Sequence, residues 1–597
     1  MRQVGIQPDV FTFPTVNRAI SCLQDGGKIH SLAIQMGFAS NVYFCNTLIG
    51  MYGRCGCVDS ASRVFDEMPL RDVVSWTSMI SCYVREEMFT DCFGLIYEMR
   101  RAEIEPNSVT IVTMMQACGM AGNAVGGTQF HAYSIKRGFG NYELVVNNSI
   151  LSMYVKTGCF EDAEVLFNNA NEKDAVSWNI MISGYSGKGN LLKVADSFNE
   201  MRLEVMPSLE TLTLVISSFA KAGELRHGQG MHAYSVKSGL NDVLLQTSIV
   251  DFYAKCGEME KSFRLFDDLP DKNSDSWSVL MSGFIQNGYF REAIELFSKM
   301  QIANVKPSTC TLRSIILAYS HLGALKLGKG AHAYMIRKGL YGHKDNASME
   351  TTILNMYAKC GSISSARTCF KHMAVKDVIA WSSMIEGYGI HGLGLKALEL
   401  FEHMQTEGVA PNSVTFLSML SACSHSGLVN EGYIIFSRMS QEFGIIPTLD
   451  HYTCLVDLLG RSGKLQEALT MIETMTAKPD SRIWGALLAA CRTYSDNALG
   501  IYVAQSLFDM EPENAGYHVV LSNVHVSGGR WNEAEYLRNL MTEKDLNKKP
   551  GWSCIETKEG FHGFVAGDRS HPQAGEIYWT LVCLKRSIEE VGYVSHY

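Results

Sequence analysis

Hydrophobic positions along this chain recur at helical spacing in paired stretches. Between residues 73 and 107, the runs VVSWTSMISCYVR and TDCFGLIYEMRRA each place apolar residues three and four apart, and the connection IEPN follows. This spacing is typical of a helix with one buried face, and Pro106 favours a turn because a proline ring stops a helix. We therefore expect two helices joined into a hairpin of about 35 residues.

The same pattern returns along the whole chain. A series of motifs related to MYGRCG at 51–56 recurs at 153–158, 252–257, 356–361 and 458–463. Tryptophans in matching contexts follow one another at spacings of 102, 99, 104 and 103 residues: Trp76, Trp178, Trp277, Trp381 and Trp484. Self-similarity at fixed spacing indicates stacked units rather than one folded-back core. We predict an all-α fold, a right-handed α-solenoid superhelix of stacked helix-turn-helix repeats.

Each period divides into three units of different length. Residues 73–107 form a unit with a proline connection, 108–143 a longer variant, and 144–174 a shorter one, and this order recurs from residues 175, 274 and 378. The pattern resembles the plant pentatricopeptide repeat family, in the subclass that alternates P, L and S motifs. The resemblance covers essentially the whole chain.

The ends of the chain extend this resemblance. Residues 1–9 align with 99–107, so we expect the repeat array, 1–480, to begin with a truncated first repeat that carries no readable targeting peptide. Two further helical hairpins at 481–548 look like the family's extension (E) motifs. Residues 549–597 resemble the E+ tail that leads into a DYW deaminase domain, and we expect the chain to stop before that domain.

The sequence lacks the signature of the enzyme that this tail precedes. A zinc cytidine deaminase needs His-x-Glu and Cys-x-x-Cys to hold the metal and activate a water. Neither occurs among the 17 histidines and 17 cysteines. We expect no catalytic activity, no cofactor and no small-molecule substrate. We interpret the repeated His-Ala-Tyr motif at 131–133, 232–234 and 332–334 as packing of the second helix rather than catalysis.

The resemblance implies that the chain reads single-stranded RNA, one base per unit, through the fifth and last residues of each unit. Their hydroxyl, amide and carboxylate groups offer different donor and acceptor sets. The predicted pairs, with the base that each implies, are Asn46 with Asp72 (uracil), Thr77 with Asn107 (adenine), Asn148 with Asp174 (uracil), Asn179 with Ser208 (cytosine), Thr247 with Asn273 (adenine), Ser278 with Ser308 (a purine), Thr351 with Asp377 (guanine), Ser382 with Asn412 (adenine) and Thr453 with Asp480 (guanine). The implied site is 5′-UAnUCnARnGAnGnnnC-3′, with the target cytosine last.

Charge and apolar residues refine this expectation. The net charge of −9 counts against non-specific binding to nucleic acid, so any RNA site needs locally placed cations. Such cations occur at the end of the first helix, where they either follow the RNA backbone or merely complement the helix dipole: Arg54, Arg85, Lys156, Lys221, Lys255, Lys359 and Arg461. Apolar residues at the second position of the units are candidates to sandwich bases: Val74, Val145, Val176, Leu244 and Ile379.

Three functions are compatible with these features. The first is a site-recognition factor for C-to-U editing of organelle transcripts, in a mitochondrion or alternatively a chloroplast, which recruits a DYW-type deaminase or other editing factors in trans. The second is an organelle RNA-binding factor for splicing, processing or stability, and the third is a protein-binding helical scaffold. No apolar stretch is long enough to cross a membrane, so no membrane partner is expected. An RNA-binding role requires the polar fifth residues to lie on an open face, because burial between hairpins would leave only the fold.

Overall fold

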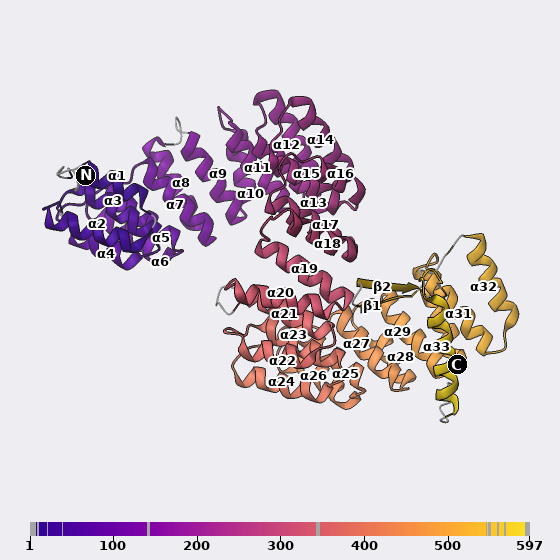
Figure 1. The fold of residues 1–597 in the computed structure, drawn as a ribbon. Coiled ribbons are helices and arrows are strands. Elements are labelled where there is room, and N and C mark those ends of the chain that lie inside the picture. Colours follow the sequence, from indigo (N-terminus) through magenta and orange to yellow (C-terminus); the bar gives the residue numbers. More distant parts are fainter. Residues whose placement is uncertain are drawn as a thin grey trace. The chain divides into compact units, whose positions relative to one another are not determined.

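The structure, a computed structural model, describes residues 8, 11–20, 22–38, 40–139, 144–341, 347–544, 546, 551–557, 560–565, 567 and 569–590. The chain divides into two compact units, Met1–Lys272 and Asn273–Tyr597. Each unit is by itself a stack of helical hairpins (Figure 1).

In the first unit, the odd-numbered helix opens each hairpin and the even-numbered helix closes it. The described hairpins are α1 (Thr12–Ala19) with α2 (Leu23–Gln35), α3 (Val42–Arg54) with α4 (Val58–Glu67), α5 (Val73–Arg85) with α6 (Phe89–Arg101), α7 (Ser108–Ala121) with α8 (Ala124–Arg137), α9 (Leu144–Thr157) with α10 (Phe160–Asn168), α11 (Ala175–Gly187) with α12 (Leu191–Glu204), α13 (Leu209–Ala222) with α14 (Leu225–Ser238), and α15 (Val243–Lys255) with α16 (Met259–Asp267).

The second unit continues the alternation and adds a short sheet and a last helix. Its elements are α17 (Ser274–Gln286) with α18 (Phe290–Ile302), α19 (Thr309–Leu322) with α20 (Leu325–Arg337), α21 (Ala347–Lys359) with α22 (Ile363–His372), α23 (Val378–Ile390) with α24 (Gly394–Thr406), α25 (Ser413–Ser426) with α26 (Val429–Gln441), α27 (Leu449–Arg461) with α28 (Leu465–Thr474), α29 (Ser481–Thr493) with α30 (Asn497–Met510), α31 (Ala515–Ser527) with α32 (Trp531–Glu543), β1 (Trp552–Thr557), β2 (Gly560–Val565) and α33 (Ala574–Glu590).

Local sequence explains where the hairpins turn. The glycine that closes the MYGRCG-type motif adopts a left-handed backbone, with φ of +81° at Gly158 and +86° at Gly361, which a residue with a Cβ rarely adopts. The chain reverses there and begins the second helix. In the units predicted to be short, that helix has 9 or 10 residues, as in α10 and α22, against 13 in α6 and α24.

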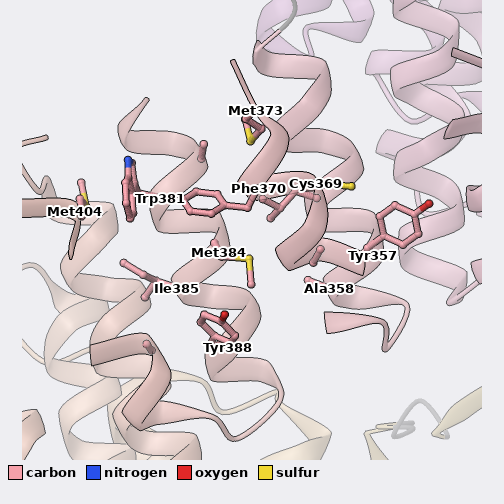
Figure 2. Close-up of a cluster of buried hydrophobic side chains, with 14 of the residues drawn as sticks. Tyr357, Ala358, Cys369, Phe370, Met373, Trp381, Met384, Ile385, Tyr388 and Met404 are labelled. Atoms are coloured by element: carbon pink, nitrogen blue, oxygen red, sulfur yellow. The ribbon is translucent and has the colours of Figure 1, made fainter. Parts of the chain in front are cut away.

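The core of each unit runs along the stack between first and second helices. Trp381, on α23, is buried, and its ring meets the ring of Phe370, on α22, edge-on at 4.9 Å between centroids (Figure 2). The same contact joins Phe65 to Trp76 and Phe167 to Trp178. Edge-on aromatic pairs add about 0.5–1.5 kcal/mol beyond the burial of their surface. The tryptophan that recurs in the sequence is therefore a packing residue that joins one hairpin to the next.

The repeated histidine also joins hairpins. His131 on α8 hydrogen-bonds through Nδ1 to the hydroxyl of Tyr154 on α9, at 2.9 Å. His232 and His332 make the same bond, to Tyr253 and Tyr357, at 3.1 and 3.0 Å. Burial lowers the pKa of all three histidines, which keeps their rings neutral. The interpretation of these histidines as packing residues agrees with these contacts.

The prediction of an all-α solenoid is confirmed, with one element that the sequence did not indicate. In the tail, β1 and β2 form an antiparallel two-stranded sheet in which Ser553 lies opposite Phe564. Within the part of the chain that the structure describes, no helix is both long and apolar enough to span a membrane. The truncated first repeat predicted at 1–9 lies almost wholly outside the described residues.

Candidate nucleic-acid interface

First helices of consecutive hairpins pack side by side, so equivalent positions recur along each stack. In the first unit α3 packs against α5, α5 against α7 and α7 against α9, and in the second α21 packs against α23 and α23 against α25. A residue at a given position of one first helix therefore has its counterpart on the next. We call the fifth residue of each unit, together with the last residue of that unit, a seam pair.

The last residue of every predicted seam pair caps the first helix of the following hairpin. Its side-chain oxygen accepts a hydrogen bond from the backbone N–H three residues further on. This holds for Asp72, Asn107, Asp174, Ser208, Asn273, Ser308, Asp377, Asn412 and Asp480. Asp, Asn and Ser are the residues that N-caps favour. A structural role thus explains the identities at this position without any base, and the capping signal was present in the sequence.

In two short units the seam pair meets directly. The Asn46 amide donates to Asp72 Oδ1 at 3.2 Å, and the Asn148 amide donates to Asp174 Oδ1 at 3.1 Å. Burial raises the pKa of both carboxyls, but the hydrogen bonds they accept outweigh it, so each pKa lies below its ordinary value. Both carboxylates are ionised acceptors near neutral pH.

In three P units the fifth residue contacts a threonine that also touches the last residue. The Thr77 and Ser382 hydroxyls lie 2.7 and 2.8 Å from Thr110 and Thr415, which donate to Asn107 and Asn412. In the third such unit, the hydroxyl of the fifth residue, Ser278, lies within hydrogen-bonding distance of the threonine, Thr311, and also of the last residue, Ser308.

Three of the remaining pairs are not brought together. Among the described residues, no hydrogen bond links the two members of these pairs: Asn179 with Ser208, Thr351 with Asp377, and Thr453 with Asp480. The Thr351 and Thr453 hydroxyls donate instead to carbonyls of their own helices, at 3.0 and 2.8 Å. Thr247 belongs to the first compact unit, whereas Asn273 belongs to the second.

The expectation that the fifth residues stand on an open face is wrong for six of the nine. Their exposed fractions are only 5–8%: Asn46, Thr77, Thr247, Ser278, Thr351 and Ser382. In four of the six, the physical reason is that a short hydroxyl side chain on a helix turns back to the carbonyl four residues earlier, as Thr77 does to Val73 at 2.7 Å. The neighbouring first helix then covers it. Asn148, Asn179 and Thr453 are half-buried, whereas Asp72, Asn273 and Asn412 are exposed.

Apolar residues at the second position do stand in the open. Val74, Val145, Val176, Leu244 and Ile379 are 49–68% exposed. Val109 and Val414 occupy the same position in two L units and are equally exposed. A large apolar residue in the open at one repeated position has no packing role within the chain, which favours a binding surface.

The predicted cations lie on the same side of these helices. Val74 and Arg85 are eleven residues apart on α5, as are Val145 and Lys156 on α9, and eleven residues make about three helical turns. All seven predicted cations are exposed. Three have partners: Arg54 donates to the Asn17 carbonyl at 2.5 Å, Lys255 pairs with Asp251 at 2.6 Å, and Arg461 pairs with Asp457 at 2.8 Å. For the other four, no ion pair is found among the described residues: Arg85, Lys156, Lys221 and Lys359.

The described residues contain no cluster of three or more His, Cys, Asp or Glu side chains placed to hold a metal ion. The geometry provides a periodic surface of exposed apolar residues and cations. The polar fifth residues, most of them buried, form a row beneath this surface. The fold and this surface together define the class as a helical-repeat binding protein.

Comparison with known proteins identifies the family. Models described as PPR repeat and PPR repeat family match residues 43–73, 71–120, 148–173, 176–204, 247–274, 272–321, 351–378, 376–425, 414–442 and 450–478, and an E motif model matches 494–556. The chain belongs to the pentatricopeptide repeat family.

Similar proteins occur in Arabidopsis thaliana. Pentatricopeptide repeat-containing protein At4g33990 is 37% identical over 100% of this chain and 72% of its own length. Pentatricopeptide repeat-containing protein At4g35130, chloroplastic, is 34% identical over 99% of this chain and 74% of its own. The crystal structure of the pentatricopeptide repeat protein PPR10 from maize is 17% identical, with a TM-score of 0.49 over 92% of this chain and 90% of that chain.

Proposed function

We propose that this protein binds single-stranded RNA in a sequence-specific way and acts as a site-recognition factor for C-to-U editing of organelle transcripts. The observation that carries the proposal is the exposed row of apolar residues and cations on the first helices. Apolar side chains can stack on bases, and cations evenly spaced can follow a phosphate backbone.

Family membership and the E motif support the editing role. A structure of maize PPR10 in complex with an 18-nt psaJ RNA element shows that a protein of this family binds RNA. The E motif at 494–556 offers a surface beyond the repeats through which a deaminase supplied in trans could be recruited. Relatives named chloroplastic favour an organelle as the compartment, and a mitochondrion is the other candidate.

Burial of six of the nine fifth residues contradicts a direct reading of bases by those residues alone, so the proposal rests on the exposed second-position residues and cations instead. A base that stacks on Val74 reaches Asn107, the half-buried last residue of that unit, more easily than Thr77, which is only 7% exposed. We therefore assign the first contact with the base edge to the last residue of each pair. In the five units whose pair is linked by hydrogen bonds, we assign the fifth residue the role of setting that residue's hydrogen-bonding partners.

The test is binding of the purified chain to an RNA that carries 5′-UAnUCnARnGAnGnnnC-3′, in competition with an RNA of the same composition in scrambled order. Tighter binding to the ordered RNA is expected, and equal binding would refute sequence-specific reading. Thr351→Asn is expected to shift the preference at the tenth base from guanine toward a pyrimidine. An unchanged preference would remove that unit from the code.

The editing role needs its own measurement. Comparison of organelle cDNA with genomic DNA in a plant that lacks this gene should reveal one or more lost C-to-U changes, each at the last cytosine of a sequence that matches the predicted site. Intact editing together with a splicing or processing defect would favour the alternative role.

A further inference from the structure

The first helix after each P unit has a threonine as its third residue. A code that uses only the fifth and last residues of a unit does not include this position. The threonine is Thr110 on α7, Thr211 on α13, Thr311 on α19 and Thr415 on α25, and each is fully buried. The helix that follows a short unit has a different residue there: Ser75, Ser177, Ser276, Ala380 or Ile483. The threonine therefore marks the junction from a P unit to an L unit.

This threonine lies within hydrogen-bonding distance of both members of the seam pair. Thr110 Oγ1 lies 2.7 Å from Thr77 Oγ1 and 2.9 Å from Asn107 Oδ1. Thr415 repeats the arrangement, at 2.8 Å from Ser382 and 3.1 Å from Asn412.

Thr311 has the same two neighbours, but here the capping last residue is a serine. Its Oγ1 lies 2.7 Å from the Ser278 hydroxyl and 3.0 Å from the Ser308 hydroxyl. Three junctions in different parts of the chain thus share the same hydrogen-bonded set of a fifth residue, a threonine and a last residue. We call this set the relay.

Proton counting shows what the relay does. A hydroxyl carries one proton. Thr77 Oγ1 has two acceptors within the protein, the Val73 carbonyl at 2.7 Å and Thr110. In one arrangement Thr110 donates to Asn107, and Thr77 then donates either to Thr110 or to the Val73 carbonyl. In the other, Thr110 donates to Thr77, and Thr77 then donates to the Val73 carbonyl. In each arrangement the Thr77 proton is used inside the protein, so Thr77 offers a base only lone pairs.

We propose that Thr110, Thr311 and Thr415 are specificity-determining positioning residues, which hold the fifth hydroxyl as a hydrogen-bond acceptor and tie its state to the identity of the last residue. In these three units, which end in Asn or Ser, the acceptor matches the amino group of adenine, whereas Thr351 and Thr453 lack, among the described residues, the link to the last residue and belong to units that end in Asp and imply guanine. This inference rests on the proposed function, because it explains a preference that exists only if the chain reads RNA.

The fourth junction supplies an internal control. Thr211 is equally buried and forms the same capping box with Ser208. The fifth residue of that unit is Asn179, whose side-chain oxygen is buried without a hydrogen-bond partner, and no hydrogen bond within the described residues joins it to Thr211. Thr211 therefore caps its helix without a link to the fifth residue.

The experiment compares Thr415→Val, which removes the hydroxyl but keeps the shape, with Thr211→Val and with Thr415→Ser, which restores a hydroxyl. Binding is measured to RNAs with adenine or guanine at the eleventh base, opposite Ser382 and Asn412. Thr415→Val should lower the preference for adenine about fivefold, the contribution of one neutral hydrogen bond. Thr415→Ser should keep the preference.

Thr211→Val should lower the melting temperature because it removes the same capping hydrogen bond, yet keep the wild-type preferences at the fifth and eleventh bases. An unchanged adenine preference in Thr415→Val would overturn the inference, as would an equal loss of preference at the fifth base in Thr211→Val. A wild-type chain without any preference between ordered and scrambled RNA would instead refute the proposed function, and the inference with it.

Discussion

At the scale of single residues, one side chain serves two purposes in the seam pairs. Asp72 accepts from the backbone N–H and the hydroxyl of Ser75, both at 2.8 Å, and from Asn46, and all three bonds go to Oδ1. None of these three bonds goes to Oδ2 of this exposed residue. Capping therefore does not compete with contact to a base, and the two roles can be separated by mutation.

The substitution Asp72→Asn separates them. Asn caps a helix about as well as Asp, whereas Ala loses about 1 kcal/mol of stability at such a site. We expect Asp72→Asn to keep the wild-type melting temperature but to change the base preferred opposite Asn46, because an amide replaces two acceptor oxygens with one acceptor and one donor group.

Thermal unfolding and RNA competition, measured on the same preparations, check both parts, with Asp72→Ala as the variant that loses the cap. If Asp72→Asn leaves the preferred base unchanged, the last residue of this unit is only a cap.

At the scale of elements, hairpins approach closely because of glycines at one repeated site of the second helix. A Cβ added to Gly228 on α14 would lie 2.1 Å from the ring of Phe252 on α15. At Gly127, Gly328 and Gly432 the added atom would lie 2.2–2.4 Å from side chains of the next first helix. Contacts this short cannot form, so the absence of a side chain sets the spacing between helices.

Gly228→Ala and Gly230→Ala form a matched pair on α14. Gly230 has nothing within 4 Å of an added Cβ. We expect Gly228→Ala to lower the free energy of unfolding by about 1–3 kcal/mol through overpacking. Gly230→Ala should be neutral or raise it by up to about 1 kcal/mol, because alanine favours a helix. Denaturant titration of both variants measures the difference, and equal effects would show that α14 shifts away from Phe252 at no cost.

At the scale of the whole molecule, the distribution of charge matters more than its sum. The chain carries −9 overall, yet cations recur on its first helices. Surface ion pairs such as Lys255 with Asp251 contribute little to stability, so cations that remain without such partners have no evident structural role. Under the proposed function they neutralise phosphates.

Salt dependence tests this assignment. Glutamine at four sites (Arg85, Lys156, Lys221 and Lys359) should reduce the slope of log K against log salt by about 0.7 for each phosphate that is no longer neutralised. The control places glutamine at four exposed cations of second helices with the same change in net charge: Arg101, Lys136, Lys237 and Arg337. The control should keep the wild-type slope. Equal slopes in the two variants would show that the first-helix cations do not face RNA.

The sequence alone determined the repeat, the order of long and short units, and the ends of helices such as 73–85. These features depend on local spacing of apolar residues and on turn chemistry, which act within a few residues. It also located residues such as Val74 and Arg85, whose exposure follows from the side of the helix that they occupy.

Only the tertiary structure decided what the polar fifth residues do. Thr77 is buried because α7 packs across α5, and its link to Asn107 passes through Thr110, which lies 33 residues further along the chain. Burial and hydrogen bonding between hairpins depend on how neighbouring units pack, which the spacing within one unit does not specify. For the same reason the sheet of β1 and β2, formed by pairing of two strands rather than by helical periodicity, was absent from the prediction.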